Sequence, residues 1–438
     1  MIMAATPEKV KTTFEASEPG PICLAEDVNH ASAFPEGGFQ AWATVAGAVL
    51  IQFCGIGPAE LLRGFTRSHS HQQIYVLVWC ISRFLRPGVL DPVVVFCNLA
   101  GYMTEATCET IPSALALFML SLCKPEKYYQ VFLAQGIGAG LGSGALYVPS
   151  VAVIAHYFKK RCALAMTIVA SGSSLGATIH PIMLNNTLRS HLGFGNAVRA
   201  SAGFISVLLL IACCLMHPRL PPSTTSPPFW KSLWRFGHDI PYVLATIALT
   251  AFMVGYFFPF FYLQLDAINH GLNETFSFYS LVILNASSCV GRLAPGAFAS
   301  RFGVIEMVVF ASGGGAALIL SMIALRTVTS VVVIGILYGF FAGVFATLQV
   351  PVMAVLTEDM GELGLRIGVA FAVVGLGGLI GPPINGALLT SDYIWWRPAL
   401  FSGVMAFTGF SFFVATLVAV RHRCQKEKEC CRCNRARK

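Results

Sequence analysis

Long apolar runs divide the sequence, and they constrain the fold more than any other feature. A helix needs about 20 mainly apolar residues to cross a bilayer. The runs of this kind lie at 39–57, 128–156, 162–184, 198–216, 240–263, 276–299, 304–325, 331–356, 364–389 and 399–420. A membrane β-barrel would show short alternating segments instead. The sequence therefore predicts an all-α membrane protein.

The composition excludes the main alternatives. Only 11% of the 438 residues are charged and 55% are hydrophobic, whereas soluble domains carry about 25% charged residues. The mean hydropathy of +0.69 agrees with this. A disordered chain is excluded by the same apolar content. The 14 cysteines are scattered through apolar runs or gathered in the tail, so they do not indicate a disulfide framework.

Two further runs, at 74–102 and 111–123, raise the expected number of membrane helices to twelve. The first contains Arg83, Arg86 and Asp91. Charges at membrane depth are costly and normally face the protein interior. The alternative is that this region is a loop or a misread gene segment, and the sequence leaves both open.

A segment rich in Pro, Ser and Thr at 218–239 separates six expected helices from six. The halves repeat weakly, since the Val148-Pro149 motif recurs as Val350-Pro351. Repeats of this kind place a substrate site between the halves, near the midplane. The predicted segments are a cytosolic arm at 1–38, a six-helix bundle at 39–217, a cytosolic loop at 218–239, a second six-helix bundle at 240–420 and a basic, Cys-rich cytosolic tail at 421–438.

The charge distribution predicts the orientation in the membrane. The net charge is +8, and eight of the basic residues lie in the last 18 positions. Basic segments stay in the cytosol, so both termini are expected there, and the excess does not indicate nucleic-acid binding. Asn273 begins a glycosylation sequon in a predicted outer loop. We expect the plasma membrane, with the vacuolar membrane as the alternative.

Several motifs resemble one family. The run from Pro35 to Trp42, the run from Tyr157 to Arg161 and the run from Gly381 to Ile384 are similar to the fungal monocarboxylate porters of the major facilitator superfamily. The resemblance implies two six-helix bundles that alternate access to a central site. It also implies movement of small organic acids, proton-coupled or facilitated, although fungal relatives also export secondary metabolites.

Arg292 is the sharpest candidate for substrate binding, because it lies inside an otherwise apolar span. A permanent charge at that depth needs a partner, and a carboxylate substrate is a natural one. Asn285 and Ser288 share its helical face. The resemblance implies an acid at the position of Ser288, and its absence weakens the case for the same proton coupling. The alternative is that Arg292 pairs internally near the inner helix end.

Other polar residues in or near the spans are weaker candidates. Glu60, just past the first span, is the predicted proton-coupling residue, with an outer-surface acid as the alternative reading. His180 is a candidate because histidine as a residue type can titrate near physiological pH, but a lone histidine near a helix end is more often structural. The remaining candidates can meet substrate or bond a neighbouring helix, and they are Tyr256, Tyr262, Gln349 and Asn385.

Two degraded copies of the superfamily's cytoplasmic gating motif are recognisable. Glu105 lacks the basic residue that should follow it, and Arg301 lacks the acid that should precede it. Lys160, Arg161 and Arg366 complete the predicted gating set. The alternative is that these basic residues only anchor the topology.

We therefore predict a proton-linked secondary transporter of a small organic acid or related metabolite, sufficient as a monomer. One alternative is an efflux transporter for a secondary metabolite from a neighbouring biosynthetic gene cluster. The other is a non-transporting nutrient receptor. No catalytic residues, metal or cofactor are predicted, because no catalytic or metal-binding motif appears. The expected partners are the substrate, protons and the lipid bilayer.

Overall fold

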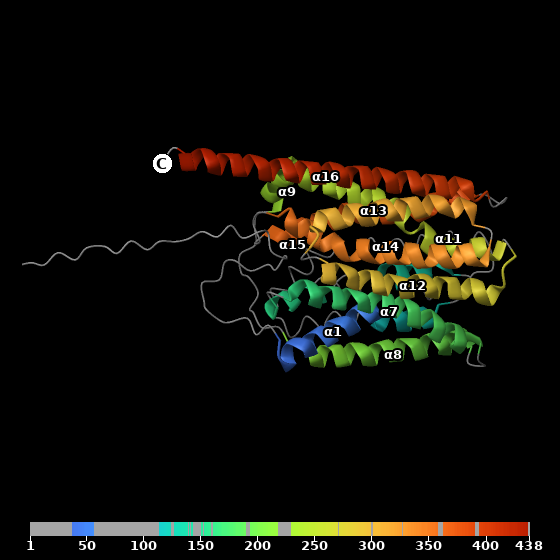
Figure 1. Cartoon of the computed structure of the whole chain (residues 1–438). Helices are drawn as coiled ribbons and strands as arrows, with labels where there is room; N and C mark the ends of the chain where they lie inside the picture. The colour runs from blue at the N-terminus through green and yellow to red at the C-terminus, as the bar shows by residue number, and fades with distance from the viewer. Residues whose placement is uncertain are drawn as a thin grey trace, which may run out of the picture.

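The computed structural model is helical throughout its described part (Figure 1), which comprises residues 37–56, 114–123, 127–138, 140, 142, 150–151, 153–158, 161–189, 193–217, 229–269, 271–298, 301–325, 327–357, 362–389 and 394–436. Within these ranges, eight helices are long and apolar enough to cross a membrane. The predicted helix at 74–102 lies outside the described residues, and the predicted helix at 111–123 lies partly outside them. Of these two, the structure describes residues 114–121 as helical.

The amino-terminal bundle is described through α1 (Phe39–Ile56), α7 (Cys162–Arg189) and α8 (Gly193–Leu215), with α1 packed against the other two. The predicted span at 128–156 is not one continuous α-helix. Its described parts are α5 (Tyr128–Val131), a π-helix at Phe132–Gly138 and a 3-10 helix at Val153–His156. Glycines recur through this stretch and lower its helix propensity.

The carboxy-terminal bundle contains the helices that follow residue 239. They are α10 (Ile240–Tyr256), α11 (Phe258–Asn269), α12 (Glu274–Phe298), α13 (Val304–Ser321) with a 3-10 turn at Met322–Ala324, α14 (Val328–Val355), α15 (Leu363–Leu389) and α16 (Trp396–Ala436). One span, 240–269, is divided between α10 and α11. The division falls at Phe257, just before Pro259, which lacks an N–H donor and fits only the first turn of a helix.

Two segments outside the predicted bundles are also helical. The predicted loop at 218–239 contains α9 (Phe229–His238), which packs on α10 and α15. The predicted tail continues α16 as one helix to Ala436, beyond the rest of the bundle (Figure 1). We use "tail end" for the end of the molecule at which residues 421–436 of α16 lie.

Close helix approach follows the same spacing in both halves. Gly172 and Gly176 lie 11 and 15 residues after Arg161, and a Cβ at either would meet the backbone of α1. Gly377 and Gly381 lie 11 and 15 residues after Arg366, and a Cβ at either would meet the backbone of α10. The internal repeat is therefore a repeat of packing, in which small residues let two helix backbones touch.

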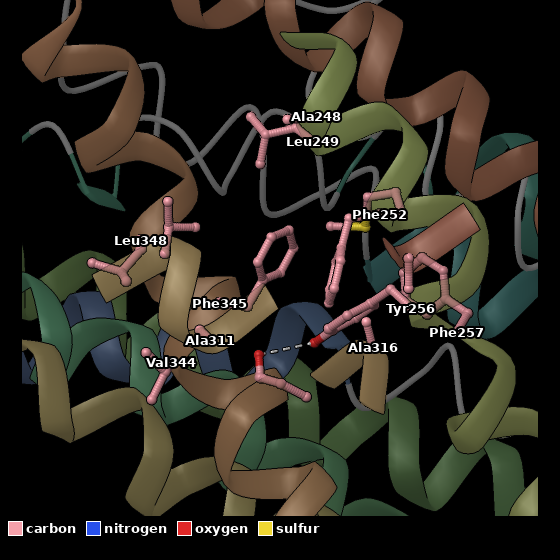
Figure 2. Packing of buried hydrophobic residues seen from close by; sticks show 14 of the residues in the cluster. Ala248, Leu249, Phe252, Tyr256, Phe257, Ala311, Ala316, Val344, Phe345 and Leu348 are labelled. Atoms are coloured by element: carbon pink, nitrogen blue, oxygen red, sulfur yellow. Dashed lines mark hydrogen bonds between the residues drawn. The ribbon is translucent and has the colours of Figure 1, made fainter. Parts of the chain in front are cut away.

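Aromatic side chains fill the core of the carboxy-terminal bundle (Figure 2). Phe252 lies 4.2 Å from Phe345, centroid to centroid, and Tyr256 lies 5.7 Å from Phe345. The hydroxyl of Tyr256 donates to the carbonyl of Ala342 at 3.3 Å, and that of Tyr338 donates to the carbonyl of Tyr256 at 2.5 Å. These bonds tie α10 to α14, so the bundle is a rigid support for residues at its surface.

Candidate functional site

The two bundles meet where α7 lies beside α12 (Figure 1), and we call this contact the seam. The Ser174 hydroxyl donates to the Ser288 hydroxyl at 3.2 Å, and both side chains are buried. Cys289 Sγ lies 3.9 Å from the carbonyl of Ser171. The seam therefore joins the two halves through small, neutral polar groups.

Arg292 crosses the seam from α12. Its guanidinium donates to the Ser173 hydroxyl at 2.6 Å and to the carbonyl of Ala170 at 3.2 Å. Its Nε is buried without a hydrogen-bond partner, and no carboxylate among the described residues forms a salt bridge with it. Among the described residues, a permanent positive charge is thus held at the junction of the halves by neutral acceptors.

The seam closes toward the tail end. A Cβ at Gly296 would meet the side chain of Thr167 and the Cα of Leu164, so the helices touch there. The described polar contacts of the seam run from this point to Ser174 and Ser288, near the middle of each helix.

Two other predicted substrate residues lie on α12 and α14. Asn285 is buried on α12, where its amide donates to the carbonyl of Leu281 at 3.1 Å. The described part of α12 thus carries Asn285, Ser288 and Arg292 on one face, as the spacing predicts. Gln349 is half-buried on α14.

Three predicted substrate residues instead bond neighbouring helices inside the carboxy-terminal bundle. Tyr256 bonds α14, as described above. The Tyr262 hydroxyl donates to the carbonyl of Pro382 at 3.2 Å. The amide oxygen of Asn385 accepts from the Ser402 hydroxyl at 2.8 Å, while its amide nitrogen is buried without a partner. Helix bonding was the alternative reading for these residues.

His180 lies inside the amino-terminal bundle, away from the seam. Its ring centroid is 4.9 Å from that of Phe53 on α1 and 6.3 Å from that of Phe204 on α8. The side chain is buried, and neither ring nitrogen forms a well-aligned hydrogen bond. This position fits a packed core ring rather than a group on the path between the halves.

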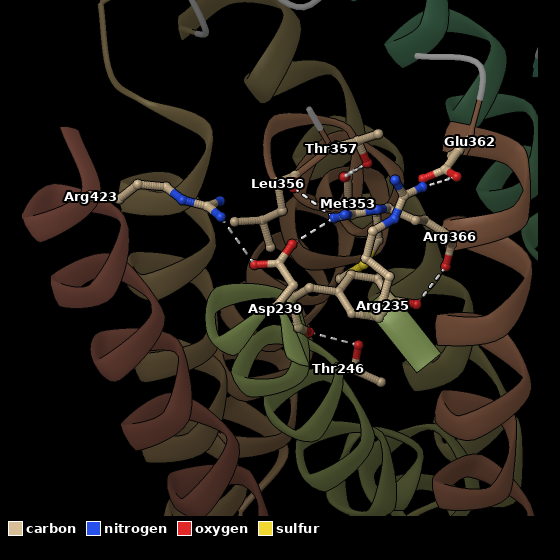
Figure 3. A network of polar contacts seen from close by, with 10 residues as sticks. Arg235, Asp239, Thr246, Met353, Leu356, Thr357, Glu362, Arg366 and Arg423 are labelled. Carbon is tan, nitrogen blue, oxygen red and sulfur yellow. Dashed lines mark hydrogen bonds and ion pairs between the residues drawn. The ribbon is translucent and has the colours of Figure 1, made fainter. Parts of the chain in front are cut away.

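Arg366, a predicted gating residue, is the centre of a buried network at the tail end (Figure 3). Its guanidinium donates to Asp239 at 2.7 Å and to the carbonyl of Leu356 at 2.9 Å. It also lies 4.8 Å from the ring centroid of Phe236. Arg423 of α16 approaches the other Asp239 oxygen at 3.6 Å. All of these partners lie on α9 or on the carboxy-terminal bundle. The network therefore holds the helices of one half together, and among the described residues it does not join the two halves.

A second ion pair holds α9 against this network. Arg235 pairs with Glu362, and the Ser232 hydroxyl donates to the same carboxylate at 3.1 Å. Sequence reasoning missed Asp239 and Glu362. A signal for Asp239 was present, because an acid directly before Ile240 and Pro241 is typical of a helix start. Its pairing with a residue 127 positions away has no local signal.

Sequence reasoning also missed Asp266. This carboxyl is 3% exposed on α11, within the 240–269 span. Its place three residues beyond the expected end of the span made it look like a loop acid. A buried carboxyl inside a membrane span is by default a functional candidate.

The remaining predicted residues are surface groups or lie outside the described ranges. Arg161 and Arg301 are exposed beside the tail-end termini of α7 and α12. Asn273 lies in the turn before α12, where its carbonyl accepts from the Ser277 amide at 2.9 Å. Its glycosylation stays a prediction. Glu60, Glu105 and Lys160 lie outside the described residues.

Comparisons with known proteins agree with this architecture. The family model described as the Major Facilitator Superfamily matches residues 108–348, more than half of the chain. The structure is similar to FucP, a fucose:proton symporter of E. coli solved in the outward conformation, with a TM-score of 0.65 and 15% identity. That match covers 86% of this chain and 98% of FucP.

Two curated relatives are named for export. The aspyridones efflux protein apdF of Emericella nidulans is 34% identical over 401 residues, which is 88% of this chain and 80% of the relative. The agnestins efflux protein AgnL12 of Paecilomyces divaricatus is 31% identical over 394 residues, which is 86% of this chain and 87% of the relative. These relatives do not support a specific assignment to the monocarboxylate porters. The chain belongs to the major facilitator superfamily and is a multi-pass secondary transporter, not an enzyme.

Proposed function

We propose that this protein exports a secondary metabolite bearing an acidic group, and that Arg292 is the residue that binds that group. The placement of Arg292 carries the proposal, because its guanidinium lies between the two halves and its acceptors among the described residues are neutral. A substrate anion reaching this point offers the guanidinium an acceptor of opposite charge, which the hydroxyl of Ser173 and the carbonyl of Ala170 are not. The efflux function of the named relatives supports export over uptake.

The seam supports an alternating-access cycle. In this proposal the tail end faces the cytosol, so contact of α7 with α12 at that end closes the path on the cytosolic side. Opening it breaks the bond from Ser174 to Ser288 and the bonds of Arg292 to α7. The side chain of Arg292 then turns to cytosolic substrate. A proton gradient is the expected driving force, and Asp266 is the described carboxyl best placed inside a span to respond to it.

Flux through proteoliposomes tests the role of Arg292. Labelled fungal metabolites with and without an acidic group are assayed under an imposed pH gradient, beside a panel of small organic acids. We expect flux of acidic metabolites, and we expect Arg292→Gln to reduce it by about 100-fold, since hydrogen bonds to charged groups contribute about 1.5–3 kcal/mol. Arg292→Lys should keep part of it.

Arg397→Gln is the matched control, because it removes the same charge from an exposed position at the start of α16. Flux that survives Arg292→Gln would keep the transporter but place the site elsewhere. Flux of small organic acids alone would return the substrate to the monocarboxylate class. Folded protein that binds metabolites and moves none of them would favour the receptor alternative.

A further inference from the structure

The surface of α9 that points away from the bundle is unusual for a cytosolic loop. Trp230 is 79% exposed and Trp234 is 72% exposed, and they lie one helical turn apart. Lys231, which is also exposed, lies beside them on the same outer arc. Exposed tryptophan is unfavourable in water, but it is favoured at the membrane–water interface, where one end of the ring system is apolar and the other polar.

The opposite face of α9 is fixed to the carboxy-terminal bundle. Phe236 is fully buried under the guanidinium of Arg366, and Ser232 is buried against Glu362. The ion pair of Arg235 with Glu362 adds a third attachment. The tryptophan face is therefore presented in one orientation by a helix that cannot rotate freely.

The position of α9 places this face at the depth of a membrane surface. His238, its last residue, is followed by Asp239 and then directly by α10, a membrane span. Asp239 is also the residue that Arg423 of α16 approaches, at 3.6 Å. The end of α9 thus lies level with the point at which α16 leaves the 396–423 span.

Basic residues of α16 extend the positive charge of α9. Arg421 and Lys426 are exposed there, and the residues from 421 to the end of the chain carry eight basic and two acidic side chains. Juxtamembrane basic clusters attract anionic headgroups by about 1 kcal/mol per residue near the surface. Charge and aromatic character therefore favour the same partner.

We infer that the exposed face of α9, together with the basic start of the α16 extension, is a binding surface for anionic phospholipid headgroups in the leaflet at the tail end. The tryptophans insert at the interface, while Lys231 and Lys426 contact headgroup phosphate or carboxylate. This anchoring holds the carboxy-terminal bundle to its leaflet while the other half moves. The inference is independent of the substrate.

Tryptophan quenching in nanodiscs tests it with the full chain. Wild type and Trp230→Phe/Trp234→Phe are placed in phosphatidylcholine discs containing an increasing fraction of phosphatidylserine brominated on its acyl chains. We expect the double variant to lose the quenching component that depends on phosphatidylserine. The other tryptophans of the six in the chain supply the common background.

Lys231→Gln tests the electrostatic part. We expect the half-quenching fraction of phosphatidylserine to rise about fivefold, corresponding to one lost basic contact, and to rise also at high salt. Lys127→Gln, exposed on the amino-terminal bundle, should leave it unchanged. Thermal unfolding of each variant confirms that the chain is folded.

Two outcomes would overturn the inference. In the first, Trp230 and Trp234 are quenched by aqueous iodide and not by brominated lipid, which would assign the face to water or to a protein partner. In the second, brominated phosphatidylcholine quenches them as well as brominated phosphatidylserine does, which would leave a neutral interfacial helix. Neither measurement depends on flux, so failure here is distinct from failure of the export proposal.

Discussion

At the scale of single residues, buried Arg366 and half-buried Arg292 have opposite surroundings. Arg366 has a carboxylate, a carbonyl and an aromatic face within reach. Arg292 donates to a hydroxyl and a carbonyl, both of which lie on the other half of the molecule. The first arrangement satisfies a charge permanently, and the second leaves it able to exchange partners. The difference separates a structural arginine from one suited to transport.

Removing Asp239 should therefore destabilise the folded protein. Asp239→Ala leaves Arg366 as an uncompensated buried charge, which typically costs about 3–5 kcal/mol. We expect a clearly lower melting temperature in detergent, measured by fluorescence-detected size exclusion after heating. Glu306→Ala is the control, because it removes an exposed pair with Arg421 that contributes about 0–1 kcal/mol. Equal stability of the two variants would contradict the structural role of the network.

At the scale of helices, the length of the apolar runs predicts most of the described elements. It does not predict which residues of different helices contact one another. The spans at 304–325 and 364–389 match α13 with its 3-10 turn and α15 closely. The break at Phe257 was not predicted, because the apolar pattern runs through it. Arg292 was predicted to matter from its isolation alone. That its acceptors lie on α7 depends on helix rotation, which one sequence does not encode locally.

The glycines of α15 supply a prediction at this scale. Gly381→Ala forces a methyl group against the α10 backbone near Val254, and overpacking of this kind costs about 1–3 kcal/mol. We expect a lower melting temperature. Gly203→Ala on α8 is the control, because no atom lies near its added methyl group and alanine favours the helix. If Gly381→Ala melts no lower than Gly203→Ala, the close approach of α10 and α15 is wrong.

At the scale of the whole molecule, the halves are held together differently from the way each is held internally. Tyrosine–carbonyl bonds, buried ion pairs and a continuous aromatic core hold the carboxy-terminal bundle. The seam relies on small residues and neutral acceptors. A rigid body with a weak boundary is the arrangement that rocking motion requires.

Cross-linking the seam should stop the motion. In Ser174→Cys/Ser288→Cys, two side chains that now meet at 3.2 Å should form a disulfide under oxidant. We expect flux to fall to background and to return with reductant. Ser287→Cys/Ile336→Cys joins α12 to α14 within one bundle, where the native residues are in contact. It should leave flux intact when oxidised. Undiminished flux in the fully cross-linked seam variant would exclude rocking about this contact.

In the proposed cycle, the chemistry of the seam also sets how the two access states are populated. A neutral hydrogen bond contributes about 1 kcal/mol net and a bond to a charged group about 1.5–3 kcal/mol, so the Ser174 bond and the two Arg292 bonds favour the closed state by roughly 4–7 kcal/mol. Shifting an equilibrium from 1:99 to 99:1 requires about 5.5 kcal/mol of differential binding. In the export cycle proposed above, a substrate that satisfies Arg292 better than α7 does supplies a large part of that difference. The empty protein would then rest closed at the tail end, and substrate binding would shift it toward the open state.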